Sequence, residues 1–214
     1  MTEDPHAGQP VLEAGLPLGE APTAVIMVHG RGATPEDILG LVPRLDHPNV
    51  TYLAPSAANR TWYPHSFLSP IESNEPHLSS ALGVLASLVA RIEAAGIPRS
   101  RVVLLGFSQG ACLSGDFAVR HASRFGGVVM LSGGLIGAPG TRWELDGTFD
   151  GTPVFLGCSD VDAHIPEARV LESADVFTRM GADVTTRIYP NMGHLVNDDE
   201  VEFARGLLDG ACPP

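Results

Sequence analysis

The chain has 214 residues, a length that fits one domain with a substantial core. Its formal net charge is −12, and all 13 basic residues are arginines, so its surface should repel nucleic acid and anionic lipid headgroups. With 44% hydrophobic and 18% charged residues, the composition is typical of a globular protein and argues against disorder.

The N-terminal segment, residues 1–10, is polar and acidic and lacks the basic start and apolar stretch of a signal peptide. No apolar run approaches the roughly 18 residues needed to cross a bilayer. Cys112, Cys158 and Cys212 cannot all pair and show no metal-ligand spacing, which is typical of packing residues in a reducing compartment. We therefore expect a single cytoplasmic domain over residues 1–214, without nucleic-acid or membrane partners and with a flexible segment at 1–10.

Short β-rich apolar runs alternate with longer amphipathic runs along the chain. This alternation predicts an α/β fold with a mostly parallel sheet and helices on both of its faces. The predicted strands are residues 11–18 (an antiparallel edge strand), 24–28, 50–54, 102–107, 127–132, 154–157 and 185–189. The predicted helices are residues 35–45, 78–95, 109–121, 167–180 and 198–208. Thr34 and Asp37 are spaced like a capping box at the start of the first helix.

Two irregular stretches, residues 55–75 and 133–151, each follow a predicted strand. Both should lie at the carboxyl edge of the sheet, where open α/β folds bind ligands. Little chain remains for a large separate lid.

A G-x-S-x-G pattern at residues 106–110 places Ser108 between a buried strand and an amphipathic helix. In that context the pattern predicts a nucleophile elbow, in which glycines on both sides relieve the clashes of a sharp turn. The turn lifts the hydroxyl out of the sheet and points a helix N-terminus at it. A glycine-rich structural turn is the alternative.

Gly193-His194 follows the last predicted strand, where a hydrolase of this topology carries its base, because the order along the chain is Ser, acid, His. The acid should come from residues 159–166, which offer both Asp160 and Asp162. His164 is expected to be a bystander near the pocket mouth. A metal site built from Asp162, His164 and His194 is the alternative.

His29-Gly30-Arg31-Gly32 follows the strand that ends at Val28. Glycines on both sides let the Arg31 backbone approach a ligand closely, so its N–H is predicted to be one oxyanion donor. The backbone N–H of Gln109, directly after the nucleophile, is predicted to be the other. We expect His29 to brace this loop beside the pocket and the Arg31 side chain to be solvated.

On these motifs the chain resembles the phospholipase/carboxylesterase family of α/β-hydrolases, which includes acyl-protein thioesterases and small bacterial carboxylesterases, from about Ala24 to the C-terminal helix. The family's acid stands four residues before a proline, which implies Asp162 rather than Asp160. An aromatic pair beside the family's acyl pocket implies that Trp62 and Tyr63 line the substrate pocket with His29; core packing is the alternative for Trp62.

The resemblance implies a serine carboxylesterase, whose mechanism needs no cofactor and no metal. The rather short chain and its open loops favour a shallow pocket and short- to medium-chain esters. A homodimer is common among such small hydrolases. A thioesterase or lysophospholipase shares the same chemistry. Pro64 stands where many members have an aspartate, which favours a bacterial subgroup with members in quinone and aromatic-compound metabolism. A non-catalytic binding protein on the same scaffold is the rival from another class.

Overall fold

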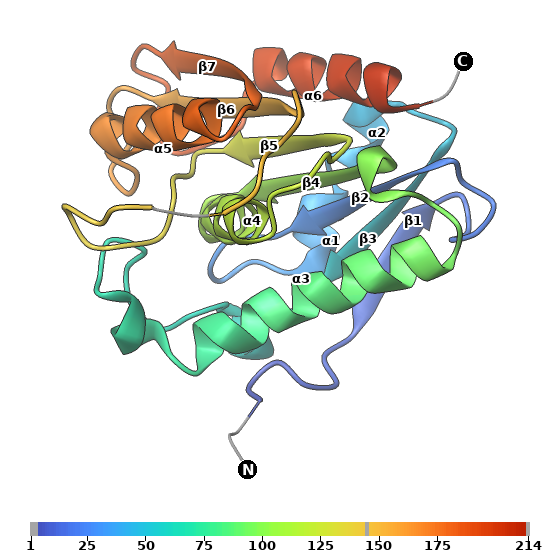
Figure 1. The fold of residues 1–214 in the computed structure, drawn as a ribbon, viewed down its shortest axis with the longest axis horizontal. Helices are drawn as coiled ribbons and strands as arrows, with labels where there is room; N and C mark the ends of the chain where they lie inside the picture. Colours follow the sequence, from blue (N-terminus) through green and yellow to red (C-terminus); the bar gives the residue numbers. More distant parts are fainter. Residues whose placement is uncertain (1–3, 144–145, 213–214) are drawn as a thin grey trace.

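A seven-stranded sheet runs through the computed structural model, which describes residues 4–143 and 146–212 (Figure 1). Its strands, in their order across the sheet, are β1 (Val11–Gly15), β3 (Val50–Pro55), β2 (Thr23–Val28), β4 (Val102–Phe107), β5 (Gly127–Leu131), β6 (Pro153–Ser159) and β7 (Asp183–Tyr189). β1 pairs with β3 in the antiparallel sense, and all the other neighbours are parallel. The predicted α/β-hydrolase fold and its antiparallel edge strand are confirmed.

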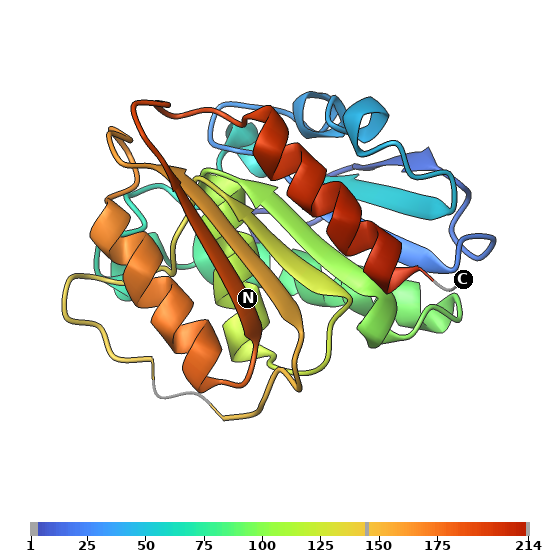
Figure 2. The same cartoon turned by 90° about the horizontal axis from the view of Figure 1, so that it is seen from above.

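In the part of the chain that the structure describes, six α-helices cover the two faces of this sheet: α1 (Pro35–Leu39), α2 (Val42–Leu45), α3 (His77–Ala94), α4 (Gln109–Arg120), α5 (Glu167–Arg179) and α6 (Asp198–Ala211). Side chains alternate along β2, so Ile26 belongs to the core cluster that includes side chains of α3, α4 and α5. Val25 and Met27 belong to the cluster on the other face, which includes side chains of α1, α2 and α6. Figure 2 shows these two groups of helices on opposite sides of the sheet. Within the described ranges, no helix combines the length and apolar character that a membrane span needs.

The first predicted helix, residues 35–45, is wrong as a single element. The structure divides it into α1 and α2 at Gly40 and Leu41. Pro43 has no N–H to donate and is tolerated only in the first turn of a helix, so a new helix begins at Val42. The Thr34–Asp37 capping box at the start of α1 is confirmed.

Residues 1–3 of the predicted flexible segment 1–10 lie outside the described residues. Most of residues 4–10 are exposed, but His6 attaches this segment to the domain. His6 is buried: its Nε2–H donates to the Trp62 carbonyl at 2.9 Å, and its Nδ1 accepts the Ala58 N–H at 3.1 Å. Burial lowers the pKa of His6 below its ordinary value, which keeps the ring neutral and suited to this donor–acceptor role.

Substitution of two helical glycines by alanine tests the close packing beside the β4–α4 turn. A Cβ added at Gly110 in α4 would lie 2.1 Å from the Val28 carbonyl oxygen, whereas one added at Gly83 in α3 would have no neighbour within 4 Å. We expect Gly110→Ala to lower the free energy of unfolding by about 2 kcal/mol or more, because backbone must move. Gly83→Ala should raise it by about 0.5–1 kcal/mol through helix propensity. Urea unfolding measures both, and equal stability of Gly110→Ala and wild type would contradict this packing.

Candidate active site

Ser108 occupies the sharp turn between β4 and α4. Its backbone has φ 56° and ψ −121°, a strained conformation for a residue with a side chain. A Cβ at Gly106 would lie 2.3 Å from the Gly110 carbonyl oxygen, so the turn requires glycine there. The Ser108 N–H donates to the Leu131 carbonyl at 2.9 Å, which ties the turn to β5. The Ser108 hydroxyl is therefore held at the carboxyl edge of the sheet.

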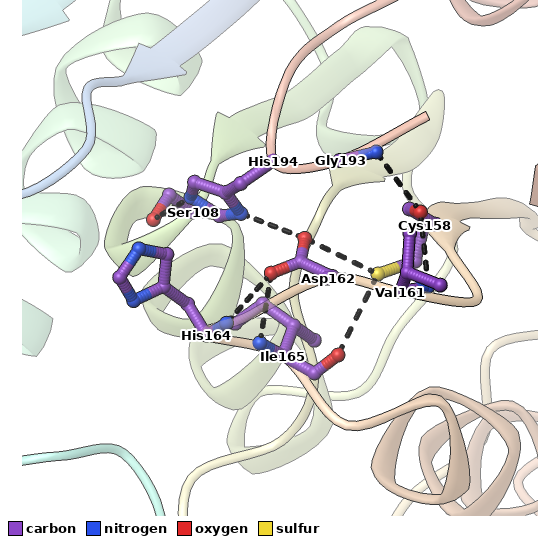
Figure 3. Close-up of polar contacts among 9 residues, drawn as sticks. Ser108, Cys158, Val161, Asp162, His164, Ile165, Gly193 and His194 are labelled. Atoms are coloured by element: carbon purple, nitrogen blue, oxygen red, sulfur yellow. Dashed lines mark hydrogen bonds and ion pairs between the residues drawn. The ribbon is translucent and has the colours of Figure 1, made fainter. Parts of the chain in front are cut away.

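A chain of two hydrogen bonds connects Ser108 with the two other residues predicted to act with it. His194 Nε2 lies 2.9 Å from Ser108 Oγ, and His194 Nδ1 lies 2.7 Å from Asp162 Oδ2 (Figure 3). With a proton on Nδ1, the ring donates to Asp162 and accepts the serine hydroxyl proton through Nε2. This arrangement has the geometry of a Ser-His-Asp constellation.

Asp162, rather than Asp160, is the carboxylate that reaches His194. The Asp162 side chain is fully buried, and its second oxygen accepts the backbone N–H groups of His164 at 2.8 Å and Ile165 at 3.0 Å. Burial by itself would raise the pKa of Asp162, but the hydrogen bonds from His194 and these N–H groups outweigh it and hold the pKa below its ordinary value. Asp160 instead accepts the Asn191 N–H at 2.8 Å.

The two backbone N–H groups predicted as oxyanion donors belong to Gln109 and Arg31. Gln109 is the first residue of α4, so its N–H has no acceptor inside the helix. The Arg31 N–H donates to no other backbone group in residues 4–143 and 146–212. The loop that carries Arg31 runs close to Ser108, since a Cβ added at Gly30 would lie 3.3 Å from Ser108 Cβ.

A cavity of about 470 Å³ opens over these groups. Its lining includes Ser108 and His194, with Tyr63, Phe67 and Ile165 among its apolar side chains. His164 also lines it, with its ring edge-on to that of His194 at 4.8 Å between centroids. Among the described residues, no group of three or more His, Cys, Asp or Glu side chains could hold a metal ion.

Two of the three predicted pocket residues lie behind the cavity rather than in its lining. Trp62 is fully buried, and its indole N–H donates to the His29 carbonyl at 2.9 Å. His29 is also buried: Nδ1–H donates to the Gly30 carbonyl at 2.8 Å, and Nε2 accepts the Ala57 N–H at 3.2 Å. Burial lowers the pKa of His29, so the ring stays neutral. His29 braces its loop, as expected, but it and Trp62 are wrong as lining residues; Tyr63 does line the cavity.

The side chains of Arg31 and Gln109 were not recognised from the sequence as structural groups. Arg31 is not merely solvated, because its guanidinium donates to the backbone carbonyls of residues 63, 64 and 65. Gln109 accepts the Trp62 N–H and donates to the Tyr63 carbonyl. Their partners lie more than 30 positions away along the chain, and no local pattern signals such contacts.

An α/β-hydrolase sheet with a Ser-His-Asp constellation at its carboxyl edge defines a broad class of proteins. Within it, this chain belongs to the phospholipase/carboxylesterase family, whose model matches residues 16–210. The family predicted from the motifs is thus confirmed.

Individual relatives agree with this placement. The chain is 38% identical to a phospholipase/carboxylesterase from Dyadobacter fermentans, with a TM-score of 0.90 over 94% of this chain and 96% of that one. It is 32% identical to acyl-protein thioesterase 1 of Gibberella zeae over 56% of this chain, a match that spans about half (52%) of that relative's length. It is 24% identical to mouse lysophospholipase-like protein 1 over 90% of this chain and 88% of that protein.

Glu200 is a buried carboxyl group just beyond the His194 loop, at the start of α6. One of its oxygens accepts the Asn197 N–H at 2.9 Å, completing a capping box. In the described part of the chain the other oxygen has no partner, and a Cβ added at Gly157 would lie 2.2 Å from it. Burial raises the pKa of Glu200 to about 7, against the hydrogen bond from Asn197 and with a contribution from Asp199.

This carboxyl group should make stability depend on pH. Because its folded-state pKa lies above the unfolded value, the folded protein binds more protons between about pH 4.5 and 7, and stability falls as pH rises through that window. The wild type should lose stability between pH 5 and pH 8, whereas Glu200→Gln should not. We expect this difference between the two proteins to be about 1–3 kcal/mol in the free energy of unfolding. Glu202→Gln, at an exposed position of the same helix, is the control and should change little. Parallel pH profiles for wild type and Glu200→Gln would rule out a buried, titrating carboxyl group.

Proposed function

We propose that this protein is a serine carboxylesterase that cleaves short- to medium-chain carboxylic esters through an acyl-enzyme. The observation that carries the proposal is the hydrogen-bonded chain Ser108–His194–Asp162, which ends at the open cavity. Family membership and the relatives' names support hydrolysis of esters or thioesters as the reaction class.

The geometry is suited to a two-step acyl transfer. Ser108 Oγ attacks the ester carbonyl carbon while its proton moves to His194 Nε2, and Asp162 stabilises the imidazolium that forms. The tetrahedral intermediate then collapses, and His194 gives the proton to the departing alkoxide. Water, deprotonated by the same nitrogen, attacks the acyl-enzyme and releases the carboxylic acid and free Ser108. None of these steps calls for a cofactor.

In this proposal the backbone N–H groups of Arg31 and Gln109 hold the negative charge on the carbonyl oxygen. Gln109 is the first residue of α4, so the dipole of this helix also favours a negative charge beside its N–H group. One such donor typically contributes roughly 3–4 kcal/mol of transition-state stabilisation.

The cavity supports the proposed substrate size. A volume of about 470 Å³ is ample for a small or medium ester, and Tyr63, Phe67 and Ile165 offer apolar contact to an acyl chain. Thioester hydrolysis is the second candidate, favoured by the similarity to acyl-protein thioesterases. We also infer a cytoplasmic site of action, with which the free state of Cys112, Cys158 and Cys212 is consistent.

Replacing the nucleophile gives the most direct test. We expect Ser108→Ala to lower kcat on 4-nitrophenyl butyrate by about 10⁴–10⁶ and to abolish labelling by a fluorophosphonate probe, because no alkoxide can form. Steady-state kinetics and mass spectrometry of the labelled peptide are the measurements. Retention of most esterase activity by Ser108→Ala, or specific labelling of another residue in wild type, would refute the proposal.

The choice between the two neighbouring aspartates can be tested in the same assay. We expect Asp162→Asn to lower kcat by about 10⁴, because the amide no longer holds the His194 tautomer. Asp160→Asn is the matched control: its amide oxygen can still accept the Asn191 N–H, so kcat should change less than about threefold. The reverse result would transfer the role of the acid to Asp160.

A further inference from the structure

One wall of the cavity is a short irregular segment, residues 62–65, which follows β3 and a single 3₁₀ turn at Ala58–Arg60. Tyr63, Pro64 and His65 face the cavity. Within the described ranges, no backbone group of residues 62–65 bonds to another backbone group. Since buried backbone needs partners, side chains from elsewhere must hold this wall.

The Arg31 guanidinium is one of these holders. It donates to the carbonyls of Tyr63 at 2.9 Å, Pro64 at 2.9 Å and His65 at 2.7 Å. Among the described residues it forms no ion pair with a carboxylate. The Arg31 guanidinium thus bonds three successive backbone carbonyls. Its several N–H donors lie in one plane, which suits this arrangement.

The Gln109 side chain is the second holder. Its Oε1 accepts the Trp62 N–H at 2.9 Å, and its Nε2 donates to the Tyr63 carbonyl at 2.8 Å. The Tyr63 carbonyl therefore receives hydrogen bonds from both Arg31 and Gln109. These are also the two residues whose backbone N–H groups are the proposed oxyanion donors.

We propose that Arg31 is a positioning residue that couples this wall to the oxyanion donors, so that a substrate group pressing on residues 63–65 improves the alignment of the Arg31 and Gln109 N–H groups. The inference rests on the proposed esterase function. Contacts with a non-reacting part of the substrate then raise kcat, because they stabilise the transition state more than the bound substrate. A small ester that leaves the wall untouched gains nothing from the coupling.

The wall has other attachments, so removal of the guanidinium should leave the fold intact. His6 Nε2–H donates to the Trp62 carbonyl, and the His65 N–H donates to Asn74 Oδ1 at 2.8 Å. A purely structural role for Arg31 would lower activity on all esters alike. A coupling role predicts a loss that grows with the size of the substrate.

The experiment compares kcat and KM on 4-nitrophenyl acetate and 4-nitrophenyl hexanoate for wild type, Arg31→Ala, Arg31→Lys and the surface control Arg205→Ala. We expect Arg31→Ala to lower kcat on both esters, with a loss on hexanoate about fivefold or more greater than the loss on acetate, in keeping with the sensitivity of catalysis to small misplacements. Guanidinium ion at tens of millimolar should restore part of the hexanoate kcat of Arg31→Ala and leave Arg205→Ala unchanged. Arg31→Lys, which keeps the charge but not the planar fork, should fall between.

Three outcomes overturn the inference: an equal loss on both esters, no loss on either, or a loss seen only as a higher KM. If Arg31→Ala shows no cooperative thermal transition, Arg31→Lys replaces it in the test. The ratio of kcat on hexanoate to kcat on acetate for Arg31→Lys is then compared with the wild-type ratio. Failure of the esterase proposal itself looks different, because wild type would then neither hydrolyse the esters nor take up the fluorophosphonate label.

Discussion

The close approach of helix α4 to the end of strand β2 is the constraint on which the site depends. Gly110 sits so near the Val28 carbonyl that no side chain fits there. This contact brings the loop after β2, with Gly30 and Arg31, against the first turn of α4, with Ser108 and Gln109. The strain at Ser108 persists because the packing on both sides of the turn leaves its backbone no alternative. One helix–strand contact therefore places Ser108, the proposed nucleophile, and both proposed oxyanion donors.

Residues 62–65 lie next to this contact between β2 and α4. They belong to no strand or helix, and their backbone groups do not bond to other described backbone groups, so their polar groups need other partners. Side chains of His6, Arg31, Gln109 and Asn74 provide them. His6 thus brings the N-terminal segment into the support of this wall, from a position 56 residues before Trp62.

The sequence was informative where the signal is local. The buried strands, the glycines around Ser108 and the order of nucleophile, acid and base are short-range patterns, and parallel strands carry their loops to one edge, so the structure brings Ser108, Asp162 and His194 together. What it could not reveal depends on contacts between distant residues. Trp62 is aromatic and near the cavity, yet only the packed structure shows it behind the lining. The break between α1 and α2 is different in kind, because Pro43 is a local signal for it.

The position of His194 follows from how two neighbouring loops are joined. The end of β6 and the loop that follows it hold the loop after β7 at three points. Ser159 Oγ accepts the Gly193 N–H at 3.1 Å, Asp160 accepts the Asn191 N–H, and Asp162 accepts the His194 ring N–H. Two of these bonds fix the backbone on the N-terminal side of His194, and the third fixes its ring. An imidazole held in this way needs little reorganisation to receive a proton from Ser108, which is the condition that makes a histidine an effective base. The two aspartates are thus not competitors for one role, since each secures a different part of the same loop.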